Sequence, residues 1–240
     1  MLLFTKGRYH VRQAETDAEI AAAQGLRALA FAGDAAGSDR DQFDDICDHI
    51  LVEDQHTGEL VACYRLLFIA SGADIKQCYA AQFYDLSMLL SYKGPLLELG
   101  RFCLHPDHND PDIVRAAWAA MTRIVDGRGV QMLFGCSSFD GCDGDRHRDA
   151  FALLQARHLA PKCWQPKQKA PEVVKLPKAQ VPPKALRQIP SLLRTYLAMG
   201  GWVSDHAVID RQMNTMHVFT GVEISAIPEG RKRILRADAK

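Results

Sequence analysis

Residues Leu96–Pro106, with the sequence LLELGRFCLHP, predict the central strand of the fold. An acid, Glu98, and a base, Arg101, stand three residues apart in this apolar segment, with Gly100 between them. Residues three apart point to opposite faces of a regular strand, but a glycine inside a strand often marks a bulge. We therefore expect a bulge at Gly100 that brings both charged side chains to one face and leaves backbone N–H groups free.

This arrangement suits acyl transfer to an amine. Such a reaction needs a base, a charged group that holds the reactants and N–H donors for the oxyanion. Glu98 and Arg101 are the candidate catalytic residues, and the backbone N–H groups of Phe102 and Cys103 are candidate oxyanion donors. The alternative is a half-buried ion pair with a structural role only, because such pairs also occupy strands.

Segments on both sides of this strand alternate between helical and extended patterns. Thr16 and Glu19 form a capping box that opens a helix, Gly33 stops that helix, and Asp112 caps a later one. A strand–loop–helix–strand unit at the centre requires a parallel pair, so we expect an α/β fold with a mixed sheet. The predicted strands are 8–13, 48–53, 59–69, 96–104, 130–137, 202–210 and 215–224, and the predicted helices are 16–31, 75–90, 112–125, 148–158 and 191–199.

Composition limits the possible partners. The 240 residues are 48% hydrophobic and 24% charged, as in an ordinary soluble protein, and the 29 basic side chains balance the 29 acidic ones. This balance gives no sign of a nucleic-acid partner. The seven cysteines form no CxxC pair and no signal peptide is evident, which predicts reduced thiols and a cytoplasmic protein. No apolar run has the length of a membrane span, so any membrane contact is expected at the surface.

The chain changes character after residue 160. Residues 161–190 hold seven of the eleven prolines and six lysines, which predicts a surface excursion without regular structure. We therefore expect an acyltransferase core at 1–160, this excursion at 161–190, and a helix and strands at 191–240 that complete the same domain. The excursion is either a solvated linker or a basic face for an acidic protein or anionic lipid. The last ten residues are basic and are expected to fray.

Several motifs together resemble a known family. The pattern from Arg27 to Arg101 is similar to the acyl-homoserine-lactone synthase branch of the GNAT acyltransferases. A closer resemblance, over nearly the whole chain, is to ornithine–acyl carrier protein N-acyltransferases. It rests on DHILV (48–52), YRLL (64–67), FYDLS (83–87), ELGRFCLHP (98–106), FGCSSF (134–139) and IPSLLRTYL (189–197).

The resemblance implies a GNAT-like fold with a central β-α-β unit and a C-terminal extension. It also implies a 3-hydroxyacyl thioester on the phosphopantetheine of acyl carrier protein as the donor, with no bound cofactor. The acceptor would be the α-amine of L-ornithine, and the product lyso-ornithine lipid. One departure is the loop His105–Pro111, which lacks a glycine-rich pyrophosphate cradle and the family's usual basic residue after His-Pro-Asp.

The other charged residues of these motifs are candidates for binding the acceptor. Asp45 or Asp48 can pair with the side-chain ammonium of ornithine, and Arg65 can hold its carboxylate in a bidentate fork. The alternative is that Arg65 and Asp48 tie neighbouring strands together. The histidines do not fall at metal-ligand spacings, so no metal is assigned.

Two other functions remain open at this point. An acyl-homoserine-lactone synthase would need an adenine pocket and has no need of the long segment after Pro161. A catalytically silent module that binds acyl carrier protein or a membrane is supported by the acidic loop His105–Pro111 alone.

Overall fold

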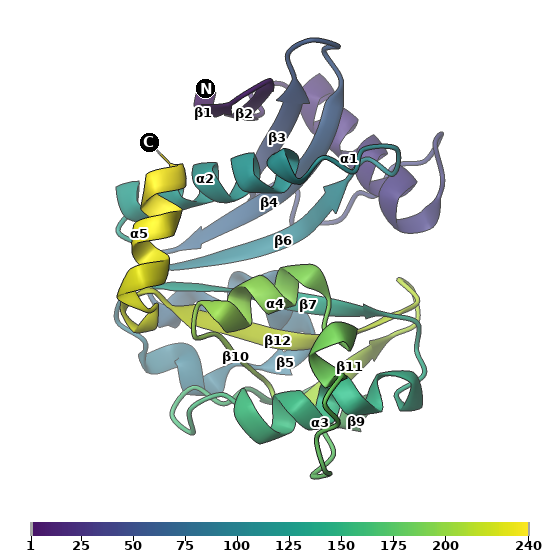
Figure 1. Ribbon diagram of the computed structural model, residues 1–240, viewed down its shortest axis with the longest axis vertical. Helices are drawn as coiled ribbons and strands as arrows, with labels where there is room; N and C mark the ends of the chain where they lie inside the picture. Colours follow the sequence, from purple (N-terminus) through teal and green to yellow (C-terminus); the bar gives the residue numbers. More distant parts are fainter. Residues whose placement is uncertain (1, 240) are drawn as a thin grey trace. The chain divides into compact units, whose positions relative to one another are not determined.

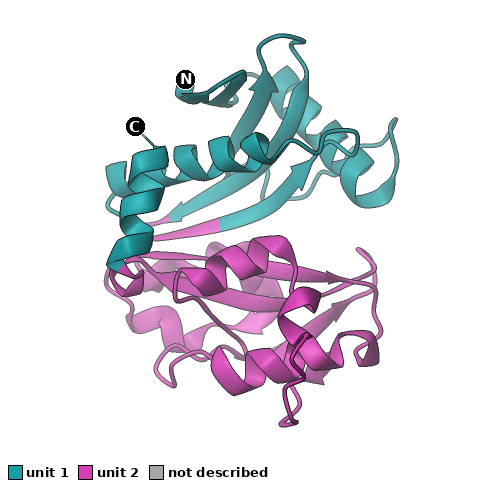
Figure 2. Ribbon diagram, viewed as in Figure 1, with its two compact units in different colours: residues 1–68, 99–130, 229–240 teal, residues 69–98, 131–228 magenta. Residues whose placement is uncertain are grey.

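The computed structural model describes residues 2–239, which form two compact units (Figure 2). Unit 1 comprises residues 1–68, 99–130 and 229–240, and unit 2 comprises residues 69–98 and 131–228. The boundary crosses strand β6 (Leu96–Leu104) between Glu98 and Leu99. The predicted central strand therefore contributes residues to both units.

Unit 1 is built on a sheet with the strand order β1-β2-β3-β4-β6. The ladders that join β1 to β2, β2 to β3 and β3 to β4 are antiparallel. Besides β6, its elements are β1 (Leu2–Lys6), β2 (Tyr9–Gln13), α1 (Asp17–Ala32), β3 (Asp48–Asp54), β4 (Leu60–Ile69), α2 (Pro111–Gly127) and α5 (Glu229–Asp238) (Figure 1).

Helices α1 and α2 cover opposite faces of this sheet. Cys63 and Tyr64 are neighbours in β4, so their side chains point to opposite faces. The Cys63 thiol lies 3.6 Å from the carbonyl oxygen of Ala23 in α1, whereas the Tyr64 hydroxyl donates to the carbonyl of Ala117 in α2. Apolar side chains of β4 are thus buried on both sides.

The ends of these helices follow from local chemistry. Thr16 and Glu19 form the predicted capping box, and Gly33 ends α1 in the left-handed conformation at φ 69°. The prediction that Asp112 caps the next helix is wrong. Asp110 is the N-cap of α2, because its carboxylate accepts the N–H of Asp112 and Pro111 occupies the first helical turn.

Unit 2 holds the sheet order β6-β7-β12-β11-β9, with β10 paired to β12, and a separate β5–β8 pair. Residues Leu96–Glu98 of β6 run parallel to Met132–Phe134 of β7, which confirms the predicted parallel pair. The other elements are η1 (Gly72–Gln77), η2 (Tyr79–Gln82), β5 (Tyr84–Asp85), η3 (Ser87–Ser91), β7 (Met132–Asp140), η4 (Asp145–His147), α3 (Arg148–Arg157), β8 (Lys167–Gln168), β9 (Val173–Lys175), η5 (Ala185–Gln188), α4 (Ser191–Ala198), β10 (Trp202–Val203), β11 (His206–Asp210), β12 (Thr215–Glu223) and η6 (Ile224–Ala226).

The helix predicted for residues 75–90 does not form. The segment is instead a series of 3₁₀ turns interrupted by the short strand β5. In an α-helix, the N–H groups of Tyr79 and Ala80 would donate to carbonyls four residues earlier. Both donate to the carboxylate of Glu98 instead, and β5 pairs with β8. Tertiary partners have therefore replaced helical hydrogen bonds.

Two further predictions of irregular structure are wrong. Residues 161–190 contain the strands β8 and β9, and β9 is stabilised by antiparallel pairing with β11. The basic C-terminal residues form the helix α5, which packs on α2. None of the helices within residues 2–239 has the length and apolar character needed to cross a bilayer.

Candidate active site

Glu98 lies in unit 2 at the last residue pair of the parallel ladder, opposite Phe134. Its side chain is almost fully buried, with 4% of the residue exposed. One carboxylate oxygen accepts the N–H of Tyr79 and the other accepts the N–H of Ala80, each at 2.8 Å. Hydrogen bonds from N–H groups to a carboxylate are stronger than neutral ones, so the 3₁₀ turn fixes the orientation of the Glu98 carboxylate.

The thiol of Cys78 lies in the electrostatic environment of Glu98. Burial raises the pKa of Cys78 well above its ordinary value, and the negative charge of Glu98 raises it further. Cys78 is therefore a neutral thiol at neutral pH. Each oxygen of a carboxylate has two lone pairs, so a carboxylate such as that of Glu98 can accept more than one hydrogen bond on each oxygen.

Arg101 marks an irregularity of β6 within unit 1. Its backbone has a φ of 52°, a left-handed conformation that is uncommon for a residue other than glycine. The bulge predicted at Gly100 stays a prediction, because β6 is a strand from Leu96 to Leu104 and its left-handed residue is Arg101. The side chain forms ion pairs with Asp39 at 3.0 Å and Asp41 at 3.2 Å. These contacts hold a backbone conformation that is costly by itself.

Asp41 joins Arg101 to Arg65 of β4. Two nitrogens of Arg65 contact the two carboxylate oxygens of Asp41, at 2.6 and 2.8 Å. Burial raises the pKa of Asp41, but its hydrogen bond and charge interaction with Arg65 lower it more, so the net shift is downward. Asp41 is an ionised carboxylate shared by two guanidinium groups.

Asp44 is the most buried acid of the same network, with 2% of its side chain exposed. It accepts hydrogen bonds from Arg27 of α1 and from Arg65, at 2.7 and 2.8 Å. Burial raises the pKa of Asp44, but the hydrogen bond from Arg27 and the neighbouring donors hold it well below its usual range. Three arginines from α1, β4 and β6 thus fix the loop that connects α1 to β3.

Sequence analysis missed the acids of this network. Asp39, Asp41 and Asp44 contact the arginines, whereas the candidates from sequence were Asp45 and Asp48. The signal was the presence of Arg27, Arg65 and Arg101 in otherwise apolar elements, because buried arginines require carboxylate partners. The acid-rich loop before β3 is the local source of such partners.

The structure brings neither Asp45 nor Asp48 to Arg65. The Asp45 side chain is 70% exposed and lies 3.5 Å from Arg40. Asp48 accepts a hydrogen bond from Gln13 and pairs with Arg128, both at 2.8 Å. Arg65 is instead held by Asp41 and Asp44, so the interpretation of Arg65 and Asp48 as a pair between strands is wrong.

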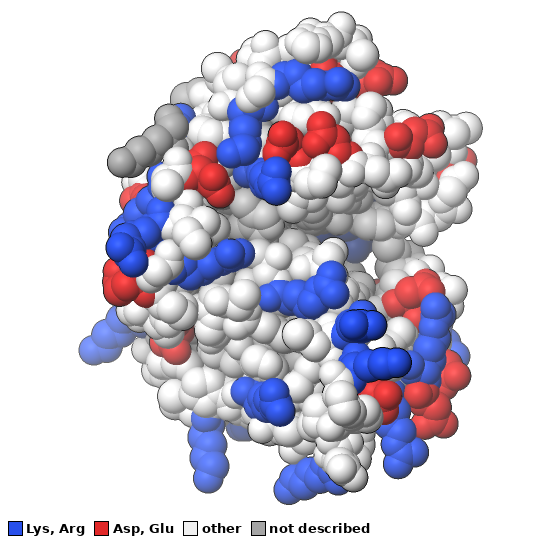
Figure 3. All heavy atoms as spheres, viewed as in Figure 1, with Lys and Arg blue, Asp and Glu red and all other residues white. Residues whose placement is uncertain are grey.

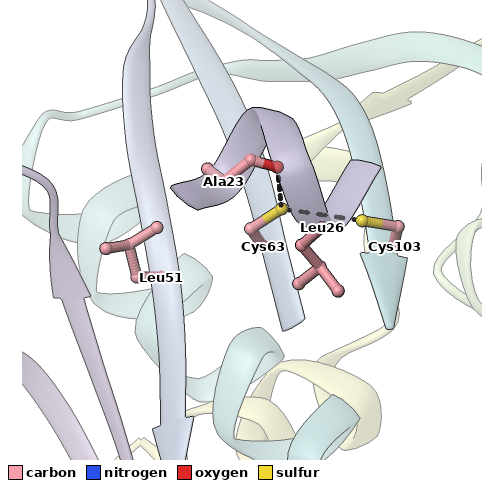
Figure 4. Packing of buried hydrophobic residues seen from close by; sticks show 5 residues of the cluster. All are labelled: Ala23, Leu26, Leu51, Cys63 and Cys103. Atoms are coloured by element: carbon pink, nitrogen blue, oxygen red, sulfur yellow. Dashed lines mark hydrogen bonds between the residues drawn. The ribbon is translucent and has the colours of Figure 1, made fainter. Parts of the chain in front are cut away.

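The side chain of Cys103 belongs to the core of unit 1, and that of Phe102 is half-buried. Phe102 stacks on Tyr64 with ring centroids 5.6 Å apart. The Cys103 sulfur lies 3.6 Å from that of Cys63, and Figure 4 shows the two sulfur atoms facing each other beside Ala23 and Leu26. The thiol–thiol hydrogen bond and burial raise the pKa of Cys63. Only the backbone N–H groups of these residues enter the proposed chemistry.

The start of α2 is occupied by side chains of the protein itself. Asp110 accepts the N–H of Asp112 at 2.9 Å and the hydroxyl hydrogen of Tyr9 at 2.8 Å. Its pKa is lowered, chiefly by the N–H of Asp112. Within residues 2–239, no three His, Cys, Asp or Glu side chains are arranged to hold a metal ion.

Comparison with known proteins identifies the family. Residues 26–119 match the acetyltransferase (GNAT) domain model. The L-ornithine N(alpha)-acyltransferase of Rhodobacter capsulatus is 32% identical over 238 residues, which cover 92% of each chain. This chain belongs to the L-ornithine N(alpha)-acyltransferase family. The acyltransferase of the same name from Brucella abortus is 30% identical over 92% of this chain and 86% of its own.

Membership in the L-ornithine N(alpha)-acyltransferase family confirms three predictions from sequence. The protein is an acyltransferase, it has a GNAT-like α/β fold with a mixed sheet, and its motifs identified the family correctly. Among solved structures, the CoA-dependent acyl-homoserine lactone synthase BjaI is similar at a TM-score of 0.48 and 11% identity, with 93% of this chain and 83% of that chain covered.

Proposed function

We propose that this acyltransferase moves a 3-hydroxyacyl chain from acyl carrier protein to the α-amine of L-ornithine and so forms lyso-ornithine lipid. The observation that carries the proposal is the 32% identity, over 92% of both chains, to a protein named L-ornithine N(alpha)-acyltransferase. An oriented, buried carboxylate at Glu98 supports the chemistry.

Glu98 is the proposed base. The α-amine of an amino acid is mostly protonated near neutral pH, and only the neutral amine attacks a thioester. Glu98 takes a proton from the amine, directly or through one water, and the amine nitrogen bonds to the thioester carbon. The attacking nitrogen then loses its second proton to solvent as the carbon–sulfur bond breaks, and the thiolate of the phosphopantetheine takes a proton from solvent. Backbone N–H groups of Phe102 or Cys103 stabilise the oxyanion.

Asp45 is the proposed partner of the side-chain ammonium of ornithine, because most of its carboxylate is exposed and available. Asp48 is the second candidate for that ammonium. Arg65 is the proposed partner of the ornithine carboxylate. Since Arg65 is held by Asp41 and Asp44, an acceptor carboxylate would have to share or replace Asp41, which is the more exposed of the two acids.

The start of α2 supports a protein-bound donor over coenzyme A. A helix N-terminus binds phosphate through free N–H groups and its dipole. Here the carboxylate of Asp110 already uses the N–H of Asp112, and Asp107 adds a second acid that is 89% exposed. A pyrophosphate would be repelled by these acids, whereas an acyl carrier protein donor presents one phosphate.

The proposed contact surface for acyl carrier protein is the basic stretch, residues 157–194. It contains nine basic residues and one acid, Glu172. An acidic partner is attracted to such a surface at a distance, which raises the association rate. The nine residues are Arg157, Lys162, Lys167, Lys169, Lys175, Lys178, Lys184, Arg187 and Arg194.

The test is mass spectrometry of the products formed by the purified protein. The donor is a 3-hydroxyacyl chain on acyl carrier protein, and the acceptors are an equimolar mixture of amino acids with S-adenosylmethionine. We expect a 3-hydroxyacyl-ornithine product. Replacing the donor with the same acyl chain on coenzyme A should greatly lower the yield.

Other results would correct specific parts of the proposal. A different acyl amino acid would retain the chemistry and replace the acceptor. An acyl-homoserine lactone would show the synthase activity that the sequence left open. Equal turnover with acyl-coenzyme A would refute the donor, and binding of acyl carrier protein without any product would indicate the silent module.

A further inference from the structure

Helix α5 concentrates positive charge at the C-terminal end of unit 1. Within the segment Glu229–Asp238, four residues are basic, and the two acids are at its ends. Figure 3 shows Lys and Arg side chains gathered along the edge of the molecule where α5 lies. The basic residues are Arg231, Lys232, Arg233 and Arg236.

Part of this charge has no acidic partner. Lys232 pairs with Glu229 at 2.8 Å, and Arg236 pairs with Asp126 of α2 at 2.9 Å. Among residues 2–239, neither Arg231 nor Arg233 forms a salt bridge within 4.0 Å, and the Nε atom of Arg231 is buried without a hydrogen-bond partner. Arg233 is exposed and Arg231 is half-buried, and the two residues, two positions apart, point to different sides of α5. These two side chains have no acidic partner among the described residues and can approach an external anion from either side of Ile234.

The outward face of α5 contains one large apolar side chain. Gly230, Arg233, Ile234 and Ala237 are spaced i, i+3, i+4 and i+7, so they lie on one face of the helix. All four are exposed, and Ile234 is 54% exposed. No residue of α5 is fully buried against the rest of unit 1.

We propose that α5 binds the surface of a bilayer that contains anionic phospholipid. Ile234 would enter the headgroup region, and Arg231 and Arg233 would contact lipid phosphates. A basic amphipathic helix of low overall hydrophobicity typically lies in the membrane interface, and juxtaposed basic residues are attracted to anionic lipid. This inference concerns location and is independent of the reaction proposed above.

A bilayer fits this face better than a protein partner does. A stable protein interface buries about 800 Å² on each side and has a packed apolar centre. The exposed face of α5 offers Ile234 alone for such a centre. A bilayer requires no shape complementarity, and its phosphate groups can adjust to Arg231 and Arg233.

The test is cosedimentation of the full-length protein with vesicles. One set contains phosphatidylcholine alone, and the other contains phosphatidylcholine mixed with phosphatidylglycerol. We expect the wild type to pellet only with the second set at low salt. The double variant Arg231→Glu, Arg233→Glu should lower the partition coefficient at least about tenfold, and Ile234→Ser should lower it by a smaller factor.

The matched control reverses two charges elsewhere, in Lys184→Glu, Arg187→Glu, and should retain vesicle binding. Circular dichroism establishes whether each variant is folded. If the double variant unfolds, Ile234→Ser, which retains all charges of α5, tests the proposal in its place. A wild type that stays in the supernatant with anionic vesicles would refute the proposal. Equal losses in both double variants would also refute it, because they would indicate attraction by overall charge.

Turnover with soluble acyl carrier protein separates this proposal from the preceding one. The Arg231→Glu, Arg233→Glu variant should turn over like the wild type when no vesicles are present. If its turnover falls while vesicle binding is unchanged, α5 is a contact for the carrier protein and the membrane proposal is wrong.

Discussion

At the scale of the residue, Glu98 is the group on which the proposed chemistry depends most. Its burial, and the two N–H donors from Tyr79 and Ala80, make it an oriented acceptor rather than a mobile surface acid. Replacing it with alanine removes the proposed base and also leaves both N–H groups without their acceptor. Both effects must be measured to assign its role.

We predict that Glu98→Ala lowers kcat by about a hundredfold or more, the usual effect of removing a general base. Glu98→Gln should also be impaired, because its amide cannot take a proton and has one acceptor atom for the two N–H groups. The measurements are steady-state kinetics and thermal unfolding of each variant. Near-normal turnover in a folded alanine variant would exclude the proposed role.

The neighbouring acids Asp44 and Asp45 allow a direct test of burial. Asp44→Asn should destabilise the protein by about 3–5 kcal/mol, because it removes the most buried charged partner that Arg27 and Arg65 share. Asp45→Asn should change the free energy of unfolding by less than about 0.5 kcal/mol, as expected for an exposed site. Urea denaturation of both variants measures the difference, and similar losses would contradict this account of the network.

At the scale of the element, the segment 72–91 links local structure to the candidate site. Its apolar sequence favoured an α-helix, but the segment forms 3₁₀ turns and the strand β5. It donates two backbone N–H groups to the carboxylate of Glu98. Its entry is tightly packed at Gly72, where an added Cβ would lie 1.8 Å from the carbonyl oxygen of Leu89. No side chain fits there without movement of the backbone.

Gly72→Ala should therefore lower both stability and kcat, because a displaced segment would release the N–H groups that orient Glu98. The matched control is Gly25→Ala in α1, where an added Cβ meets nothing within 4 Å. That variant should stabilise the protein by about 0.5–1 kcal/mol, since alanine favours a helix over glycine. Thermal unfolding and kinetics of both variants test this prediction, and unchanged kinetics in Gly72→Ala would refute the proposed link.

At the scale of the whole molecule, buried histidines predict how stability depends on pH. His217 of β12 is 2% exposed, and burial lowers its pKa to about 4. In the unfolded chain its pKa is about 6.5. Between these values the unfolded state binds more protons, so the free energy of unfolding rises as pH increases from about 4 to about 6.5.

This one group should contribute about 3 kcal/mol across that window. His217→Asn should flatten the dependence of unfolding free energy on pH between 4 and 6.5, with loss of some stability at pH 7 because the variant changes a buried site. Urea denaturation at a series of pH values measures the slope. An unchanged slope in the variant would show that other groups cause the acid sensitivity.

The sequence by itself determined the features that depend on local pattern. Apolar periodicity located α1, α2, α3 and most strands, the capping box at Thr16 located the start of α1, and the parallel pair of β6 and β7 followed from the connection between them. The motifs around Glu98 and Arg101 identified the family without any knowledge of contacts. These features could be predicted because the interactions that define them lie within a few residues or within one connection.

Only the tertiary structure decided which charged groups meet. Asp41 and Asp44, rather than Asp48, hold Arg65, because the loop before β3 folds over the buried guanidinium groups. The segment 72–91 has no α-helix, because two of its backbone N–H groups donate to the carboxylate of Glu98 and its strand β5 pairs with β8. The free energies of burial and of hydrogen bonds between residues far apart in the chain exceed local helix propensity. A single sequence does not identify which distant residues form these contacts.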